Sequence, residues 1–483
     1  MGAIKKILVV GIIILVFLIS APIIFDKIFK IQGKEETYTP QSEEIKMINK
    51  ESLRKFWKIV VGLGVILGII TTIFTIYIPY KEGRDHQKII EESLQSIQLD
   101  ISSGLFDKAF GRIVALENKF NGSEKPDIIA DLEHKKGVCY YNFSQRANAN
   151  ENTRDENLNN ALISFNKALK VFTKEKYPTQ YASTNTNIGV IYATFSKYKN
   201  RVENSKESIS YFKKALEIHK DDNVSYDYAK IQINLGASYG TLAMLGVDKE
   251  TNFINSIISF EEALRFFTLE KYPYQYAFAK CNLGVAHSNL NDLPEGKKYL
   301  YLALDEFNES LKVYTIEKYP GDYANILFNL AVTHRRLSFF ENPLNNLKIA
   351  LGYCEDSLLI NTFERNKESY GSIKITQGAI YRRLSEIDNQ NKEQYLINAL
   401  DAYSQALILY KIYNEPYQYA LIYGNIGNVY IEFSKIKDKQ DNVIKAIEAF
   451  DEALKIFTPE NYPSDYYRTI KNKEMAQVLL IEE

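Results

Sequence analysis

The sequence predicts an all-α protein, a superhelical solenoid of helical hairpins preceded by two transmembrane helices. Between residues 160 and 467 a pattern recurs about every 47 residues, and repeats of this length form solenoids because each copy buries its apolar face only against its neighbours. Apolar residues within the copies follow a helical period. Two uncharged apolar runs, at 7–25 and 59–79, precede the repeats.

The two apolar runs predict membrane helices at 1–25 and 57–80. At 19 and 21 residues, each run is long enough to cross a hydrocarbon core of about 30 Å. The basic start, Met1–Lys6, also fits a signal peptide. The best cleavage site, after Ala21, is followed by Pro22, which favours a retained signal anchor. We therefore expect an integral, multi-pass membrane protein.

Residues 26–56 form a predicted polar loop between the spans, with few apolar residues after Phe29. The segment between the spans holds eight Lys and Arg residues up to Lys58, whereas the outer flanks hold five. The positive-inside rule therefore places the loop inside the cell and the repeats outside it.

A Gly-x-x-x-Gly motif lies in the second run, at Gly64 and Gly68. Two small residues on one face of a membrane helix let another helix approach closely. The motif permits a homodimer through this face, or pairing of the second span with the first.

Two series of small residues define the repeat. The first series is Ala168, Ala215, Ala263, Ser310, Ser357, Ala406 and Ala453. The second series is Gly189, Gly236, Gly284, Ala331, Gly378 and Gly427. The step from the first series to the second is always 21 residues, whereas the return step varies from 26 to 28. The fixed step indicates packed helices joined by a set turn, and the variable step indicates a loop that tolerates insertion.

Each half of the repeat is predicted to be a helix, and together the repeats form a domain at 85–483. Residues 85–120 begin it, and NKEMAQVLLIEE at 472–483 closes it. Proline is tolerated in a first helical turn, where its missing N–H would be unpaired anyway. The prolines expected to open a helix are Pro178, Pro273, Pro320, Pro416 and Pro463.

The repeat resembles the tetratricopeptide repeat (TPR) family. The first helix of that family carries Leu-Gly followed by Tyr three residues on, matched by Leu235-Gly236-Tyr239. The second helix carries an aromatic residue followed by Ala, matched by Phe212 and Ala215. This chain departs from the family in its period, which exceeds the usual value of about 34 residues. It also departs where His287 and His334 replace the Tyr.

The resemblance implies two further expectations. TPR arrays mostly work in the cytosol, which conflicts with the positive-inside count, and we take a cytoplasmic repeat domain as the working prediction. In such arrays the first helix lines the concave face, where asparagines clamp the backbone of an extended peptide. An Asn stands two residues before the second small residue in most copies, at Asn187, Asn234, Asn282, Asn329 and Asn425. The alternative is an internal ladder in which each Asn bonds to a neighbouring helix.

No catalytic pattern stands out in the sequence. It contains no Gly-rich phosphate loop, paired-His metal motif or Gly-x-Ser-x-Gly elbow, so we predict no enzyme, no cofactor and no metal. His287 and His334 are read as aromatic packing residues, and the three cysteines as small buried hydrophobic residues. The balance of 59 basic against 60 acidic residues argues against nucleic acid as the main partner.

Two functions remain. In the first, the chain is a membrane-anchored scaffold or adaptor that binds a protein or peptide in the concave groove. In the second, it is a sensory or regulatory subunit of a membrane enzyme or transport system, and its spans transmit the signal.

Overall fold

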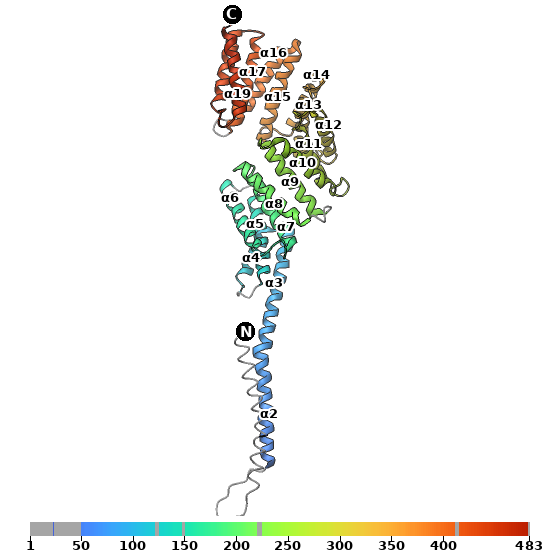
Figure 1. Cartoon of the computed structure of the whole chain (residues 1–483), viewed down its shortest axis with the longest axis vertical. Coiled ribbons are helices and arrows are strands. Elements are labelled where there is room, and N and C mark those ends of the chain that lie inside the picture. Colours follow the sequence, from blue (N-terminus) through green and yellow to red (C-terminus); the bar gives the residue numbers. More distant parts are fainter. Residues whose placement is uncertain are drawn as a thin grey trace, which may run out of the picture. The chain divides into compact units, whose positions relative to one another are not determined.

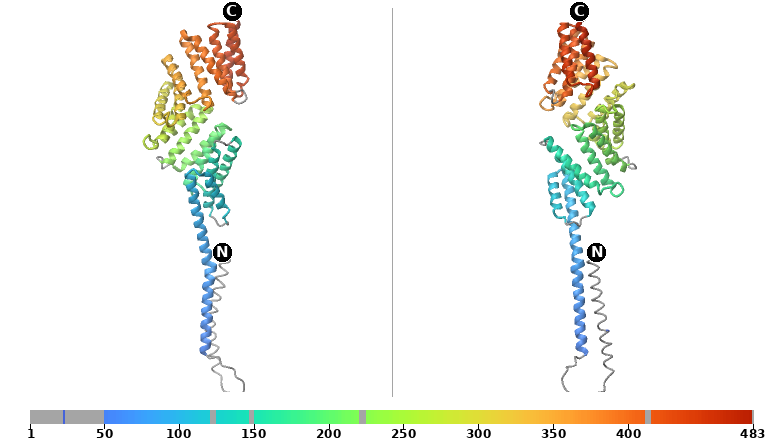
Figure 2. Two further views of the ribbon diagram at one scale, coloured as in Figure 1. Left: turned by 180° about the vertical axis from the view of Figure 1, so that it is seen from behind. Right: turned by 60° about the vertical axis from the view of Figure 1, so that its left-hand side comes forward.

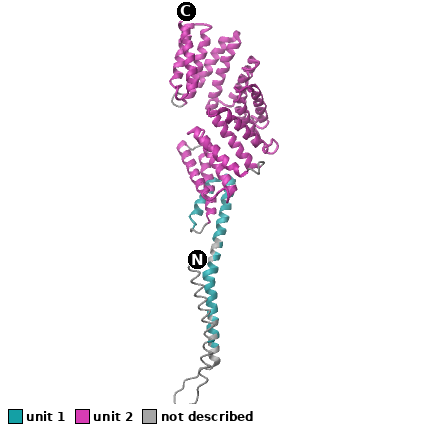
Figure 3. Ribbon diagram, viewed as in Figure 1, with its two compact units in different colours: residues 1–124 teal, residues 125–483 magenta. Residues whose placement is uncertain are grey.

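The computed structural model describes residue 23 and residues 50–120, 125–146, 150–219, 225–410 and 415–481. All regular structure in these ranges is helical, which confirms the predicted all-α class for the described residues. The chain divides into two compact units, Met1–Glu124 and Lys125–Glu483 (Figure 3). The compact unit that holds the hairpins begins at Lys125, and the predicted repeat-domain bounds of 85–483 stay a prediction.

The first unit contains an unbroken helical run. Helix α2 (Lys50–Thr72), the π-helical segment η1 (Ile73–Tyr77) and α3 (Ile78–Ser102) follow one another without a break, because the joining residues keep right-handed helical angles. Gly104, at φ 72°, then permits the tight turn into α4 (Phe106–Glu117). Asp100 ties α3 to α4 through Lys108 at 3.1 Å and Arg112 at 2.7 Å.

One helix among the described residues, Lys58–Tyr77, is long and apolar enough to cross a membrane. Its apolar side chains are exposed around the helix rather than along one stripe, as Leu67 (65%) and Phe74 (66%) illustrate. Membrane insertion of this helix stays a prediction. The helix begins at Lys50, before the predicted start at residue 57.

The first predicted span lies outside the described residues apart from Ile23, and so does the polar loop up to residue 49. In the second span Gly64 is half-buried, and a methyl group added at Gly68 would meet nothing within 4 Å. Helix pairing through these two glycines stays a prediction.

The second unit is a row of antiparallel helical hairpins, stacked in chain order and closed by a last helix (Figures 1 and 2). Each first helix packs most extensively against the helix that follows it. The first helices are α5 (Pro126–Ser144), α7 (Pro178–Phe195), α9 (Tyr226–Met244), α11 (Pro273–Ser288), α13 (Pro320–Leu337), α15 (Lys367–Ile387), α17 (Pro416–Ser434) and the closing α19 (Pro463–Ile481).

The second helices have closely similar lengths. They are α6 (Glu151–Leu169), α8 (Arg201–Leu216), α10 (Lys249–Leu264), α12 (Gly296–Leu311), α14 (Pro343–Leu358), α16 (Lys392–Leu407) and α18 (Lys439–Leu454). Short 3₁₀ segments lie beside two of them, η2 (Glu217–His219) and η3 (Asn389–Asn391).

The turn that leads into a first helix has a repeated construction. Each of the five prolines expected to open a helix is the first residue of one, which confirms that prediction. In the turn before α11, the Tyr272 amide donates to the Thr268 carbonyl at 2.9 Å. The Tyr272 ring then packs edge-on against Phe267, with centroids 5.4 Å apart. The Glu-Lys-Tyr-Pro motif is therefore a structural turn whose tyrosine covers the end of the preceding helix.

Six hairpins are locked by a glycine on the first helix and an aromatic ring on the second. A Cβ built on Gly189 would lie 2.7 Å from the Phe212 ring, and one on Gly284 would lie 2.8 Å from Phe307. Side chains cannot approach so closely, so only glycine fits beneath the ring. The same contact recurs in the pairs Gly137–Phe165, Gly236–Phe260, Gly378–Tyr403 and Gly427–Phe450.

The hairpin α13–α14 departs from this pattern on both sides. Ala331 stands in place of glycine, and Cys354 stands in place of the ring. Both residues are fully buried. The extra methyl group of Ala331 is therefore accommodated by the smaller side chain of Cys354. The departure from glycine at position 331 is compensated by the departure from an aromatic ring at position 354.

The loop that leads into a second helix uses asparagine and aspartate. Residues in the left-handed region, which short polar side chains tolerate, precede four of these helices. They are Asn200, Asp248, Asn342 and Asp438, with φ between 39° and 46°. Four residues later an Asn amide donates back to the loop carbonyl, as Asn252 does to Val247 at 2.8 Å. Asn204, Asn346 and Asn442 make the same bond.

Candidate functional site

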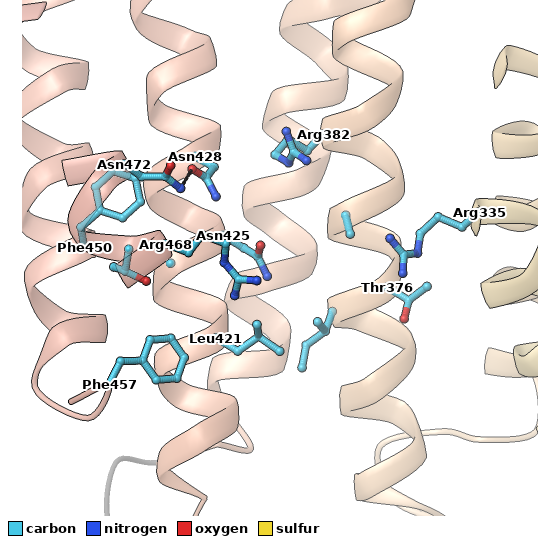
Figure 4. Close-up of a pocket in the computed structure, with 14 residues that line it drawn as sticks. Arg335, Thr376, Arg382, Leu421, Asn425, Asn428, Phe450, Phe457, Arg468 and Asn472 are labelled. Carbon is cyan, nitrogen blue, oxygen red and sulfur yellow. Dashed lines mark hydrogen bonds between the residues drawn. The ribbon is translucent and has the colours of Figure 1, made fainter. Parts of the chain in front are cut away.

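A cavity of about 450 Å³ opens at the C-terminal end of the repeat unit. Four successive first helices contribute to it, namely α13, α15, α17 and α19. We call it the first-helix cavity. Its apolar part comes from side chains such as Ile375, Leu421, Phe450 and Phe457. Its polar part is lined by Arg335, Thr376, Arg382, Asn425, Asn428, Arg468, Thr469 and Asn472 (Figure 4).

Three of the polar side chains share one register of the repeat. Asn425 stands two residues before Gly427, and Thr376 stands two residues before Gly378. Asn472 follows 47 residues after Asn425, on the closing helix. The glycine–ring contact fixes the rotation of α15 and α17, so Thr376 and Asn425 face the same side, and Asn472 lines the same cavity from α19. Sequence reasoning found Asn425 but missed Asn472, although the repeat spacing alone would have located it.

The five predicted asparagines all lie on first helices and are all half-buried. Their amide bonds differ. The Asn187 amide lies 3.5 Å from Nε2 of His134 on the preceding first helix. Asn282 donates to the Phe278 carbonyl of its own helix at 2.8 Å, and Asn329 lies 4.0 Å from the Cys281 sulfur.

Among the described residues, neither the Asn234 amide nor the Asn425 amide has a hydrogen-bond partner. Asn425 alone of the five lines the cavity. The series thus contains both internal contacts and free amides. Peptide clamping by the whole series stays a prediction, with Asn425 as its best-placed member.

Three arginines line the cavity, and no acidic residue does. Arg382 pairs with Glu386, and Arg468 pairs with Asp465. Arg335 has no carboxylate partner among the described residues. Arg335 and Arg468 extend toward the cavity from opposite sides (Figure 4). The cavity therefore carries a surplus of positive charge.

Two buried donors lack partners among the described residues: Nε of Arg335, which lines the cavity, and the hydroxyl of Tyr403, which packs on Gly378 and does not line it. Burial lowers the pKa of Arg335 from its usual value, although a guanidinium stays charged in proteins. Burial likewise raises the pKa of Tyr403, while nearby Arg382 and Arg335 lower it slightly. Tyr403 therefore keeps its proton and remains a donor. Leaving a buried donor unbonded costs about 1–3 kcal/mol, so these two groups favour an acceptor.

The histidines and cysteines singled out in the sequence serve packing. His287 is buried, bonds to Glu306 at 2.8 Å and stacks on Tyr299. His334 bonds to Asn346 at 3.0 Å on the facing helix. Cys139 and Cys354 are buried, and Cys281 is half-buried. In the described part of the chain, no three His, Cys, Asp or Glu side chains gather as a metal site.

No known protein family matches the sequence, and no curated protein matches it either. Among solved structures, the apo form of the quorum sensor NprR from B. thuringiensis is similar over 82% of this chain and 99% of its own, with 12% identity and a TM-score of 0.45. Apo RapI covers 80% of this chain and 99% of its own, with 15% identity and a TM-score of 0.42.

Yeast Tom70 is similar over 89% of this chain and 95% of its own, with 13% identity and a TM-score of 0.35. All three TM-scores are below 0.5, so the description of this chain as a helical-hairpin solenoid rests on its own helices.

Proposed function

We propose that the chain is a membrane-anchored scaffold whose repeats bind an extended segment of a protein partner in the first-helix cavity. The observation that carries the proposal is the cavity itself, which three successive first helices, α15, α17 and α19, line with amide and hydroxyl side chains, while α13 adds a guanidinium. An asparagine amide offers one donor group and one acceptor, which complement the N–H and C=O of a peptide backbone.

The spacing of the first helices also suits an extended chain. Neighbouring first helices contact one another in the pairs α13–α15, α15–α17 and α17–α19. Packed helices lie about 8–10 Å apart, which corresponds to roughly three residues of an extended strand at about 3.3 Å each. The side chains at Thr376, Asn425 and Asn472 stand at intervals that match such a peptide. Asn472 already donates to Asn428 at 3.0 Å and Thr376 to the Ser372 carbonyl at 3.0 Å, so Asn425 is the amide of the three that is left for the peptide. The TPR-like sequence pattern supports the same mode of binding.

The anchor in this proposal is the apolar helix Lys58–Tyr77. Thr71 and Thr72 donate their hydroxyl groups to carbonyls four residues earlier, at 2.7 and 2.8 Å. These bonds satisfy hydroxyl groups that would otherwise be costly in lipid. We expect the full-length chain to stay in the membrane pellet after carbonate extraction. Its release into the soluble fraction would remove the anchor from the proposal.

Peptide binding can be tested with a matched pair of variants. Peptides displayed as a library are selected on the full-length chain in nanodiscs, and the selected peptides are titrated against Asn425→Ala and Asn282→Ala. Both residues occupy the same register, but only Asn425 lines the cavity. Loss of one hydrogen bond, about 0.5–1.5 kcal/mol, should weaken binding to Asn425→Ala up to about tenfold. Asn282→Ala should bind as the unmodified chain does.

Two results would contradict the proposal. In one, the two variants bind equally well, which places the peptide elsewhere. In the other, Asn425→Ala lowers the melting temperature while affinity per folded molecule stays the same. That second result would assign the asparagine to an internal ladder.

The second candidate function, a signal-transmitting subunit, is favoured by the unbroken run from α2 through α3. Such a run could carry a rotation or a shift along its length, and π-helical segments such as η1 often occur at functional sites. Replacing residues 50–80 with an unrelated anchor separates the two candidates. A scaffold still recruits its partner and supports the partner's activity, whereas a transducer recruits the partner but loses the activity.

A further inference from the structure

We infer that the first-helix cavity selects a peptide by an anionic group, held between Arg335 and Arg468 next to an apolar side chain. The inference rests on the proposed function and adds the chemical class of the segment that is bound. It follows from three independent features of the cavity: its charge, its unbonded donor and its apolar wall.

The charge of the cavity is the first feature. Its lining contains three guanidinium groups and no carboxylate. Glu386 partly neutralises Arg382 but also pairs with Arg383, so one carboxylate serves two arginines. Arg335 has no acidic partner among the described residues. A ligand that brought a negative charge would therefore supply the missing counter-charge.

The unbonded donor is the second feature. Nε of Arg335, a residue that lines the cavity, is buried without a partner in the described part of the chain. The hydroxyl of Tyr403 is also buried and unbonded, but Tyr403 lies behind Gly378 and does not line the cavity. The Arg335 guanidinium donates, and an anionic oxygen pair accepts. A guanidinium presents parallel N–H groups that match a carboxylate or phosphate in two bonds at once. Neither a cation nor an apolar group could satisfy this donor.

The apolar wall is the third feature. Leu421, Phe457 and Ile375 line the same cavity as the arginines. Successive side chains of an extended peptide point to opposite sides, so an anionic residue and an apolar residue two positions apart share one side. The preferred segment thus carries an anionic residue close to an apolar one. Asp, Glu and phosphorylated residues all carry such an anion.

The test uses short synthetic peptides in which leucine alternates with one other residue: Asp, Glu, phosphoserine, Asn, Gln or Lys. Each is titrated against the full-length chain in nanodiscs. Charge-assisted hydrogen bonds predict that the anionic peptides bind about tenfold or more tightly than Asn and Gln peptides. The preference should shrink in high salt. The ratio of phosphoserine to Asp and Glu affinities distinguishes the two sources of the anion.

Arg335→Gln should reduce affinity for the anionic peptides to that of the neutral ones. The matched control is Arg365→Gln, which removes the same charge from an exposed turn outside the cavity and should leave the preference unchanged. Arg468→Gln tests the same preference at the other arginine. The Arg468 side chain is 61% exposed, so its replacement should leave the fold intact. Circular dichroism confirms that each variant is folded.

The inference is overturned if neutral or basic peptides bind as tightly as anionic ones, or if Arg335→Gln and Arg468→Gln both keep the full preference. Failure of the proposed function gives a different pattern. In that case no peptide in the panel or the displayed library binds, and Asn425→Ala changes nothing. Binding without charge preference that still depends on Asn425 would retain the function and discard the inference.

Discussion

The hairpins α11–α12 and α13–α14 are neighbours with the same geometry but different locking residues. In the first, Gly284 lies beneath the Phe307 ring, and in the second, Ala331 lies beside Cys354. A methyl group has been gained on one helix, and a ring has been lost on the other. The comparison shows that packing constrains the combined size of the two facing residues, and not the size of either residue alone.

Removal of the aromatic ring should cause the largest loss of stability. Phe307→Ala should lower the free energy of unfolding by about 3–5 kcal/mol, because it leaves a cavity over a glycine. Cys354→Ala removes a single buried sulfur atom and should cost much less. The losses of stability in both variants are measured by thermal unfolding of the full-length chain and by hydrogen exchange in α11–α14. Equal losses for the two variants would contradict the special role of the ring.

The first hairpin extends the comparison to pH, since the His134 ring packs edge-on against its locking residue Phe165, with centroids 5.3 Å apart. Burial, helped by Lys135, lowers the pKa of His134 from 6.5 to about 4. The unfolded chain then binds more protons between these values, so stability should be full above pH 6.5 and fall as the pH drops toward 4.

The expected loss is on the order of 3 kcal/mol, at 1.36 kcal/mol for each unit of the shift from 6.5 to about 4. His134→Gln should remove that part of the pH dependence. Unfolding measured between pH 7 and 4 for both chains provides the check. Parallel curves for the two chains would show that His134 does not titrate in this range.

In the third prediction, the residue pair of α11–α12 is exchanged for that of α13–α14. Gly284→Ala places a Cβ 2.8 Å from Phe307 and should cost about 1–3 kcal/mol through overpacking. Adding Phe307→Cys recreates the pair of the next hairpin, and the double variant should lose less than the sum of the single losses. A double-mutant cycle measures this coupling. Strict additivity would mean that the two positions do not form a unit.

The smallest expected effect concerns a serine that both hairpins share. Ser310 and Ser357 replace the alanine of other copies, and each hydroxyl donates at 2.8 Å to the facing helix, to the carbonyls of Ala277 and Ala324. Ser357→Ala should therefore cost about 0.5–1.5 kcal/mol. The matched change Ala406→Ser introduces a hydroxyl into a fully buried site. Chemical denaturation should show both variants destabilised, and a stabilised Ser357→Ala would contradict the bond.

The repeat positions were predictable because they depend on spacing along the chain. The small residues, the helix-opening prolines and the face that carries Asn425 all follow from a period in the sequence. The asparagines that close the loops, such as Asn204 and Asn252, were not predicted. They belong to the segment of variable length, and their role depends on the left-handed residue four positions earlier.

The charge of the cavity could not be predicted for a different reason. Arg335 and Arg382 share a register, but Arg468 lies elsewhere in its repeat, so no period links the three. Whether a guanidinium lacks a partner depends on which side chains surround it in space. The sequence shows that Arg335 is present, and only the packing around Cys354 and Tyr403 shows that its Nε is buried and unbonded.

The glycine–ring lock has a consequence for how such a chain can change in length. Both halves of each lock lie within one hairpin, as Gly189 and Phe212 do in α7–α8. A recombination event that duplicated or deleted one complete hairpin would therefore carry the lock with it and leave no ring without its glycine. An event that divided a hairpin would separate the two. Arrays built in this way are expected to grow and shrink in whole hairpins, and their ligand cavities can be lengthened without redesign of the core.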